Sequence, residues 1–224
     1  MTDFDQQGRA LMTSRRKRIM VNFVEATREL ILTEGVDGLS IRKISNEAGY
    51  NSATLYNYFR DLEHLTLFGS VCYLRDYVVA LGSTLTPEMR SIDRFRAIYH
   101  CFNSFAFRYP DIFHNLFFGR YSDILEEVLQ TYYNELFPEE LTGLSENLRR
   151  MLVSGNIQER DRITMDEMVQ DGFVAAEKAE IVLNLIAALQ QHYIYQAHID
   201  CTLDVKHHEQ RFNEIFDSIL ETAK

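Results

Sequence analysis

The fold of this chain is decided by residues 35–65, which read GVDGLSIRKISNEAGYNSATLYNYFRDLEHL. Ser40 is a good helix N-cap, because its hydroxyl can accept a hydrogen bond from an unpaired backbone N–H of the first turn. Gly49 can adopt the left-handed backbone conformation that commonly ends a helix. The stretch therefore predicts two short helices, at 41–48 and 52–58, joined by a tight turn.

The second of these helices has one apolar side and several polar and aromatic faces. Asn51 can cap it, and Leu55 and Phe59 lie four residues apart on its apolar side. The other faces carry Ser52, Ala53, Thr54, Tyr56, Asn57 and Tyr58. Small side chains let a helix approach base edges in the major groove, and hydroxyls often contact phosphate oxygens. The pattern predicts a helix-turn-helix that binds double-stranded DNA; the alternative is a helical hairpin that only packs.

The distribution of charge favours DNA binding. Residues 1–60 hold 9 Lys/Arg and 7 Asp/Glu, a net charge of +2; residues 61–224 hold 14 and 26, a net charge of −12; together these give −10. A basic cluster at 14–18 leads into a helix predicted over 17–34. Positive charge near the motif would attract a phosphate backbone. The candidate DNA-contacting residues are Arg15, Arg16, Lys17, Ser40, Arg42, Lys43, Asn51, Ser52, Ala53, Thr54, Tyr56, Asn57 and Tyr58.

These residues resemble the DNA-binding domain of the TetR family of transcriptional regulators. The resemblance runs from about Arg15 to Leu67 and includes the runs at 40–45, 48–49 and 54–59. It implies an all-α protein with an N-terminal three-helix helix-turn-helix domain. It also implies a C-terminal helical bundle that binds a ligand and dimerises.

Three positions depart from the family pattern. Leu62 stands where the family usually has a lysine that contacts phosphate, which puts that contact in doubt. Ser45 stands in place of alanine, and Tyr50 in place of valine in the turn. Serine is small enough to preserve the packing, whereas Tyr50 would alter the surface of the turn or add a contact.

Composition fits a helical, cytoplasmic protein. The chain has 224 residues, 46% hydrophobic and 25% charged, with only three prolines and ten glycines to interrupt helices. Its three cysteines show no zinc or disulfide spacing, which favours a reducing compartment. The first residues lack a signal-peptide pattern, and no uninterrupted apolar run approaches the roughly 20 residues of a membrane helix.

We expect three parts along the chain: a flexible tail at 1–13, a helix-turn-helix DNA-binding domain at 14–65, and a helical domain for effector binding and dimerisation at 66–224. The boundary falls inside a helix predicted over 62–81. Motion in the second domain could then pass to the first.

Two amphipathic helices expected at 175–199 and 204–222 need an apolar partner. In the resembled family such helices form a four-helix dimer interface, so we expect a homodimer that reads a palindromic operator. The alternative is that both helices close a core within one chain.

The segment 92–137 holds 13 aromatic residues, most of which must be core. A helical bundle this rich in rings can also enclose a pocket for a flat, apolar or aromatic small molecule. Candidate ligand-binding residues are Tyr99, Phe102, Asn103, Phe117 and Tyr133. We expect a repressor that this effector releases from its operator, although an effector could equally favour the DNA-bound form.

The sequence does not favour an enzyme. His207 and His208 are adjacent, so their side chains on a helix diverge by about 100°, a poor geometry for one metal. No glycine-rich phosphate loop is present, and we expect no catalytic residue, metal or cofactor. The remaining alternative is a helical protein-interaction module that has lost specific DNA binding, which only Leu62 supports.

Overall fold

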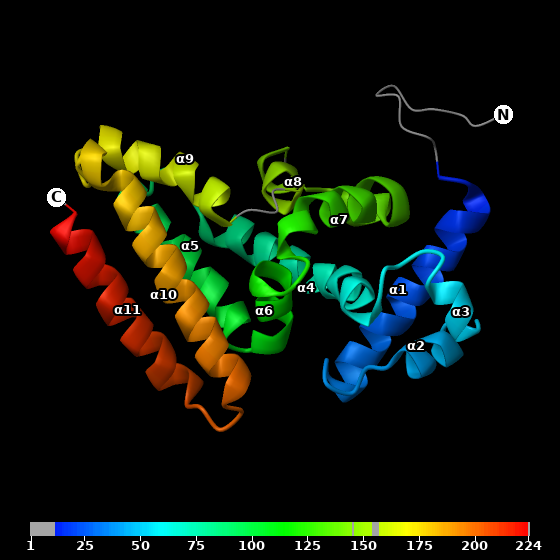
Figure 1. Ribbon diagram of the computed structural model, residues 1–224. Coiled ribbons are helices and arrows are strands. Elements are labelled where there is room, and N and C mark those ends of the chain that lie inside the picture. The colour runs from blue at the N-terminus through cyan, green and yellow to red at the C-terminus, as the bar shows by residue number, and fades with distance from the viewer. Residues whose placement is uncertain (1–11, 145, 154–156, 224) are drawn as a thin grey trace. The chain divides into compact units, whose positions relative to one another are not determined.

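The computed structural model describes residues 12–144, 146–153 and 157–223 (Figure 1). Most of the tail expected at 1–13 therefore lies outside the described residues. Every regular element in the described ranges is helical, which confirms the all-α fold class. The elements are α1 (Ser14–Glu34), α2 (Ile41–Glu47), α3 (Ser52–Leu55), α4 (Leu62–Thr84), α5 (Ser91–Ala106), α6 (Pro110–Phe118), η1 (Ser122–Ile124), α7 (Leu125–Thr131), η2 (Tyr132–Leu136), η3 (Pro138–Leu141), α8 (Glu146–Val153), α9 (Ile157–Gln170), η4 (Ala176–Lys178), α10 (Ala179–Ile199) and α11 (Val205–Thr222).

Two predicted helix boundaries near the N-terminus were wrong. Helix α1 begins at Ser14 rather than at 17, because Thr13 caps it by accepting a hydrogen bond from the Arg16 N–H at 3.3 Å. The basic cluster is thus part of the helix. Helix α3 ends at Leu55 rather than at 58, because the chain then tightens and the Tyr58 N–H donates to the Leu55 carbonyl three residues back.

The chain divides into two compact units. The first, called the head unit here, comprises residues up to 70 together with 127–143; the second, the body unit, comprises 71–126 and 144–224. The division passes through α4. The grouping of 127–143 with the N-terminal helices differs from the single continuous domain expected over 66–224, and it reflects contacts of η2 with α1.

In the head unit, apolar side chains of α1 to α4 form one core. Phe23, Ile44, Leu55 and Phe59 are almost fully buried. The crossing of α1 and α4 is tight, because a Cβ placed on Gly69 would lie only 2.6 Å from Thr27 Cγ2. The shared core holds α2 and α3 against α1.

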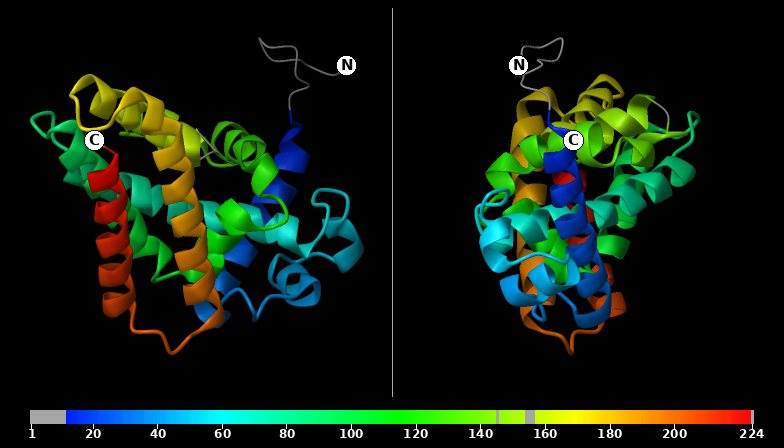
Figure 2. Two further views of the ribbon diagram at one scale, coloured as in Figure 1. Left: turned by 60° about the vertical axis from the view of Figure 1, so that its left-hand side comes forward. Right: turned by 90° about the vertical axis from the view of Figure 1, so that its right-hand side faces the viewer.

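In the body unit, α5, α6, α9, α10 and α11 pack around aromatic side chains. Phe95 and Tyr99 of α5 meet Phe216 of α11, with ring centroids 5.7 and 4.9 Å apart. Helices α10 and α11 lie side by side and run in opposite directions, joined by the loop at 200–204 (Figure 2). Most of the aromatic residues of the body unit are core, as expected.

Helix α4 is, among the described helices, the one long and apolar enough to cross a membrane, with a mean hydropathy of 1.2. The expectation that no uninterrupted apolar run approaches the length of a membrane helix is not contradicted, because Glu63, Arg75 and Asp76 interrupt α4. Moreover, 61% of the apolar window of α4 is buried, and the core helix of a soluble protein passes the same test. The helix is therefore weak evidence for a membrane segment.

Candidate nucleic-acid interface

Local hydrogen bonds fix the turn between α2 and α3, as the sequence predicts. Ser40 Oγ accepts from the Lys43 N–H at 3.3 Å and caps α2. Gly49 has a φ of 77°, in the left-handed region that glycine adopts without strain. Asn51 Oδ1 accepts from the Thr54 N–H at 2.8 Å and caps α3. The predicted caps and the glycine turn are confirmed.

Tyr50, one of the three departures, adds a contact to α1. Its ring lies 5.3 Å from that of Phe23, between centroids. Its hydroxyl accepts a hydrogen bond from Asn22 Nδ2 at 3.3 Å. The tyrosine therefore braces the turn against α1, a role that a valine in the same position could fill only in part.

Ser45, the second departure, is buried with 1% of its surface exposed. Its hydroxyl has no hydrogen-bond partner within the described part of the chain. A buried hydroxyl without a partner is unfavourable. The serine thus preserves the packing but adds no visible contact.

Several candidate DNA-contacting side chains lie on the outer face of the motif. Arg42, Ala53, Tyr56 and Asn57 are exposed, Tyr56 to 56%. Ser52 is half-buried. These side chains form a small, mostly neutral surface with one cation, suited to entering a groove.

The basic cluster at the start of α1 reaches this motif. The Arg16 guanidinium lies 5.2 Å from the centroid of the half-buried Tyr58 ring, a cation–π distance. Arg15 is also exposed. The structure therefore brings part of the cluster beside the end of α3, where it can add positive charge to the interface.

Other candidates hold the motif together. Lys43 Nζ pairs with Glu34 at 2.5 Å and donates to the Gly38 carbonyl at 2.8 Å. Thr54 Oγ1 donates to Asn51 Oδ1 at 3.0 Å. A contact between Lys43 and a phosphate would have to replace its bond to Glu34.

Lys17 faces a groove of about 370 Å³ between α1 and the segment 136–139 of the head unit. The groove is lined by Ser14, Lys17, Arg18, Val21, Glu25, Leu136, Phe137 and Glu139. Lys17 thus lies half-buried on a side of α1 that is also covered by the segment 127–143.

The start of α4, where Leu62 departs from the family pattern, has a cap that we did not predict. Asp61 Oδ1 accepts from the His64 N–H at 2.9 Å, and His64 Nδ1 accepts from the Arg60 N–H at 3.1 Å. Burial lowers the pKa of His64, and the nearby Arg60 lowers it further. The neutral ring then carries its proton on Nε2. An aspartate directly before the helix was the signal in the sequence.

The structure brings together four of the five candidate ligand-binding residues. Tyr99, Phe102 and Asn103 are buried on α5, and the ring of Phe117 on α6 lies 5.6 Å from that of Phe102. Tyr133 is buried in η2, which belongs to the head unit. Tyr133 therefore belongs to a different unit from the other four candidates.

Tyr99 makes a buried polar contact that sequence reasoning missed. Its hydroxyl donates a hydrogen bond to Asp161, which is 4% exposed on α9. Burial raises the pKa of Tyr99 well above its usual value, and the charge of Asp161 raises it further. The tyrosine therefore stays protonated and can satisfy this carboxylate.

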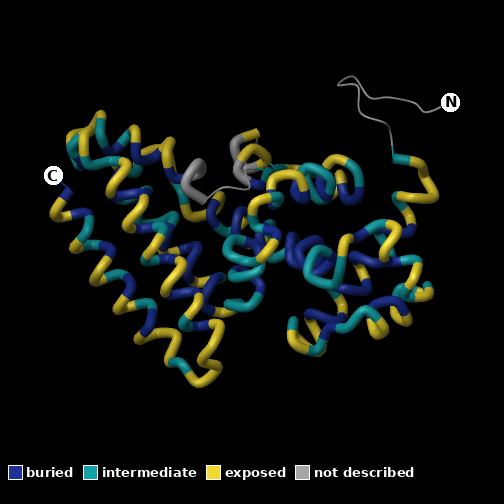
Figure 3. The backbone as a smooth tube through the Cα atoms, in the orientation of Figure 1, coloured by how far each residue is buried: buried dark blue, intermediate teal, exposed yellow. Residues whose placement is uncertain are grey.

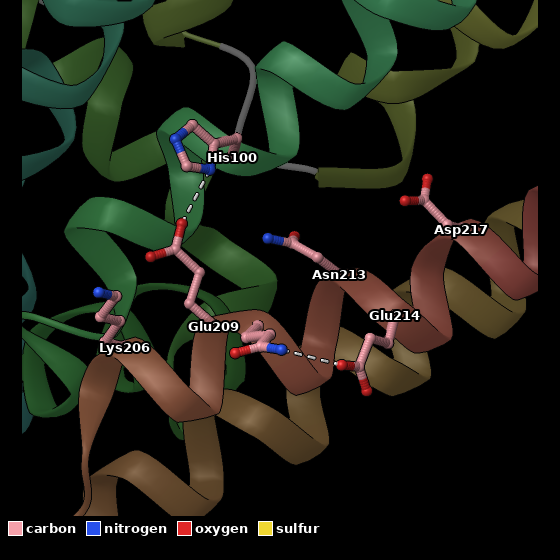
Figure 4. A pocket seen from close by; sticks show the side chains of 7 residues that line it. His100, Lys206, Glu209, Asn213, Glu214 and Asp217 are labelled. Atoms are coloured by element: carbon pink, nitrogen blue, oxygen red, sulfur yellow. Dashed lines mark hydrogen bonds and ion pairs between the residues drawn. The ribbon is translucent and has the colours of Figure 1, made fainter.

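A polar groove of about 380 Å³ lies on the body unit between α5 and α11 (Figure 4). It is lined by His100, Lys206, Glu209, Gln210, Asn213, Glu214 and Asp217. His100 Nδ1 lies 2.9 Å from Glu209 at one end of the groove. None of the five candidate ligand-binding residues lines it, and its polar walls do not suit an apolar effector.

Three histidines and one cysteine of the body unit have contacts or burial typical of a structural role. The His208 ring bonds to the Tyr193 carbonyl at 2.9 Å, and His114 stacks on His198 with centroids 4.7 Å apart. Burial raises the pKa of the Cys101 thiol, which lowers its reactivity. No group of three His, Cys, Asp or Glu side chains suited to a metal occurs in the ranges that the structure describes.

Comparison with known proteins relates the chain to one family. Residues 23–67 match the family model described as bacterial regulatory proteins, tetR family. No curated protein matches the chain.

Solved structures share its fold. RolR in complex with resorcinol is 17% identical over 93% of this chain and 89% of its own, with a TM-score of 0.62. The TetR-family repressor FadR of Thermus thermophilus in complex with lauroyl-CoA is 15% identical over 90% and 93%, with a TM-score of 0.57. The fatty acid degradation regulator FadR of Bacillus halodurans is 13% identical over 90% and 94%, with a TM-score of 0.51.

Proposed function

We propose that this chain is a member of the tetR family of bacterial regulatory proteins, whose model matches residues 23–67, and that it is a DNA-binding repressor released from its operator by a small-molecule effector. The observation that carries the proposal is the capped turn at 40–54 with an exposed outer face beside Arg16. Its place of action is the cytoplasm, where an operator would be accessible.

The outer faces of α2 and α3 contact the DNA. Ala53 and Asn57 would meet base edges, because Ala53 is exposed on α3, the helix that enters the major groove, and Asn57 is exposed in the turn that follows it. Arg16, Arg42 and Tyr56 would contact the phosphate backbone and orient the motif. Specificity and affinity would thus rest on different side chains.

The protein acts as a homodimer through α10 and α11. One side of α10 exposes residues spaced alternately by four and three positions: Ile181, Leu185, Ala188, His192, Tyr195 and Ile199. The exposed fractions of Ile181, Leu185 and Ile199 are 59%, 50% and 61%. In Figure 3 the exposed residues recur along α10, opposite its buried side. This spacing is the pattern of a helix that packs on another helix, and a second copy supplies the partner.

The effector is an apolar or aromatic small molecule bound within the body unit. The abundance of buried rings on α5, α6 and α11 supports this class of ligand. Two proteins of similar fold are described in complex with resorcinol and with lauroyl-CoA. Tyr99, Phe102, Asn103 and Phe117 remain the proposed contacts.

The decisive experiment is selection of bound duplexes from a random DNA pool by the purified full chain. Enrichment of a palindrome, with half-sites about one helical turn apart, would support both DNA binding and the dimer. If no duplex is enriched even in dilute salt, the proposal is wrong. The chain would then fit the alternative, a helical interaction module without specific DNA binding.

A further inference from the structure

Two buried amide side chains meet in the core of the body unit. Gln190 Nε2 on α10 donates a hydrogen bond to Asn103 Oδ1 on α5 at 2.8 Å. The exposed fractions of Asn103 and Gln190 are 0% and 1%. Amides are rarely placed so deep unless their polar atoms are satisfied.

This pair leaves one donor and one acceptor unused. Two facing amides can exchange two hydrogen bonds, but here only one is formed. Asn103 Nδ2 and Gln190 Oε1 have no hydrogen-bond partner within the described residues. Buried donors and acceptors without partners are unfavourable, so a well-packed core would not retain both without a use for them.

Aromatic residues lie about one helical turn from each member of the pair, and their rings meet that of Phe212 on α11. Tyr99 and Phe107 lie one helical turn before and after Asn103 on α5. Both rings lie near that of Phe212 on α11, with centroids 6.3 and 6.1 Å away. Tyr193 follows Gln190 by about one turn on α10, and its ring is 5.4 Å from that of Phe212. The unused donor and acceptor thus lie close in sequence to a cluster of aromatic side chains.

We infer that Asn103 and Gln190 are the polar recognition element of the effector site, and that the ligand is a flat, apolar molecule carrying a hydroxyl group. The hydroxyl accepts a hydrogen bond from Asn103 Nδ2 and donates one to Gln190 Oε1, which satisfies both unused atoms. The ring of the ligand packs among the aromatic side chains. This inference rests on the proposed effector function and names the chemical class that the site selects.

The first test compares two molecules of nearly equal shape. Phenol and toluene differ by a hydroxyl in place of a methyl group, and toluene is the more hydrophobic. Isothermal titration of the purified full chain, without DNA, should show phenol binding about tenfold more tightly than toluene, as expected for two satisfied hydrogen bonds. Equal binding, preference for toluene, or binding of neither molecule would overturn the inference.

The second test replaces the pair with apolar side chains of similar volume, Asn103→Leu together with Gln190→Met. The ligand-free double variant should melt at a higher temperature than the wild type, because two unsatisfied atoms are removed. Its preference for phenol over toluene should disappear. A lower melting temperature, or a retained preference, would mean that the amides are structural and would overturn the inference. Gln196→Met, on the same helix, is the matched control and should keep the preference.

The two tests separate this inference from the proposed function. Calorimetry without DNA does not depend on operator binding. A chain that prefers phenol but binds no duplex would contradict the proposed function alone. A chain that binds its operator but shows no preference for phenol would contradict the inference alone.

Discussion

Glu140 accepts a hydrogen bond from Arg28 Nη1 at 2.9 Å, although the two residues lie 112 positions apart. The Tyr132 hydroxyl lies 3.2 Å from both carboxylate oxygens of Glu140. The Arg28 guanidinium also lies 5.4 Å from the centroid of the Phe137 ring. These contacts fasten the segment 127–143 to α1, the helix on which the DNA-binding motif rests.

Loss of the Glu140 charge should weaken this attachment. Glu140→Gln keeps the shape of the side chain but removes a largely buried charge partner of Arg28, so the free energy of unfolding should fall by about 1–2 kcal/mol. Urea titration followed by circular dichroism measures the change. Glu139→Gln, at the exposed neighbouring position, should have almost no effect. Equal stability of the two variants would contradict the role given to Glu140.

Two serines in the motif should respond to alanine in opposite ways. Ser40→Ala removes the cap of α2 and should cost about 1 kcal/mol of stability. Ser45→Ala removes a buried hydroxyl that has no partner in the described ranges, so stability should stay unchanged or rise by up to about 1 kcal/mol. Thermal melting of each variant beside the wild type measures the two changes. A loss of stability in Ser45→Ala would show that its hydroxyl has a partner after all.

Arg42 should contribute to affinity for any duplex. Arg42→Ala should weaken binding about five- to tenfold whatever the sequence, and lower the slope of log affinity against log salt by about one. Fluorescence anisotropy at several salt concentrations measures both quantities. Arg108→Ala, an exposed cation of the body unit, is the control and should leave the slope unchanged.

Ala53 should contribute to sequence choice instead. Ala53→Ser should change which base is preferred at one position of the half-site, with little change in the salt slope. Repeating the selection from a random DNA pool tests this. An identical enriched site for variant and wild type would exclude Ala53 from base recognition.

The exposed side of α10 from Ile181 to Ile199, called the stripe here, predicts a dimer that an added charge would disrupt. Ile199→Glu should shift the protein from dimer to monomer, because it places a charge in the apolar seam. Sedimentation velocity measures the association state. Ile163→Glu is a matched control on α9, since Ile163 is also exposed, to 71%, but lies outside the stripe. If both variants stay dimeric, another surface forms the interface.

Acid should destabilise the head unit through His64. Burial lowers the pKa of this histidine, so the folded state favours the neutral ring while the unfolded chain takes up a proton below about pH 6.5. The stabilisation by neutral His64 is therefore complete above that pH and is lost as the pH falls towards the lowered pKa. The melting temperature should drop between pH 7.5 and 5.5, and His64→Asn, which keeps an acceptor for the Arg60 N–H, should reduce the drop. If the melting temperature falls equally with pH in the wild type and in His64→Asn, this role of His64 is wrong.

Features set by neighbouring residues could be predicted from the sequence. The caps at Ser40 and Asn51 and the turn at Gly49 depend on bonds that span at most a few positions. The family resemblance added the prediction that these helices form a DNA-binding domain of a transcriptional regulator. The N-cap of α1 was not predicted, because the basic residues at 14–18 were expected to lead into the helix. The Thr13 hydroxyl can accept a hydrogen bond from the first turn, as a good N-cap does.

Features set by distant residues could not be predicted in the same way. Arg28 and Glu140 are separated by 112 positions, and Asn103 and Gln190 by 87. Helical periodicity shows which face of a helix is apolar, but it does not show which other helix covers that face. For this reason the place of 127–143 in the head unit, and the partner of Asn103, required three-dimensional coordinates.

The close crossing at Gly69 has a mechanical consequence. Gly69 places no side chain of α4 at this crossing, so only the side chains of Thr27 and Ile31 separate the two helix backbones there. Backbone sits almost directly against α1 at this point, and α4 continues without interruption beyond the head unit to Thr84. A rotation of α4 at this crossing would therefore press directly on the side chains of α1.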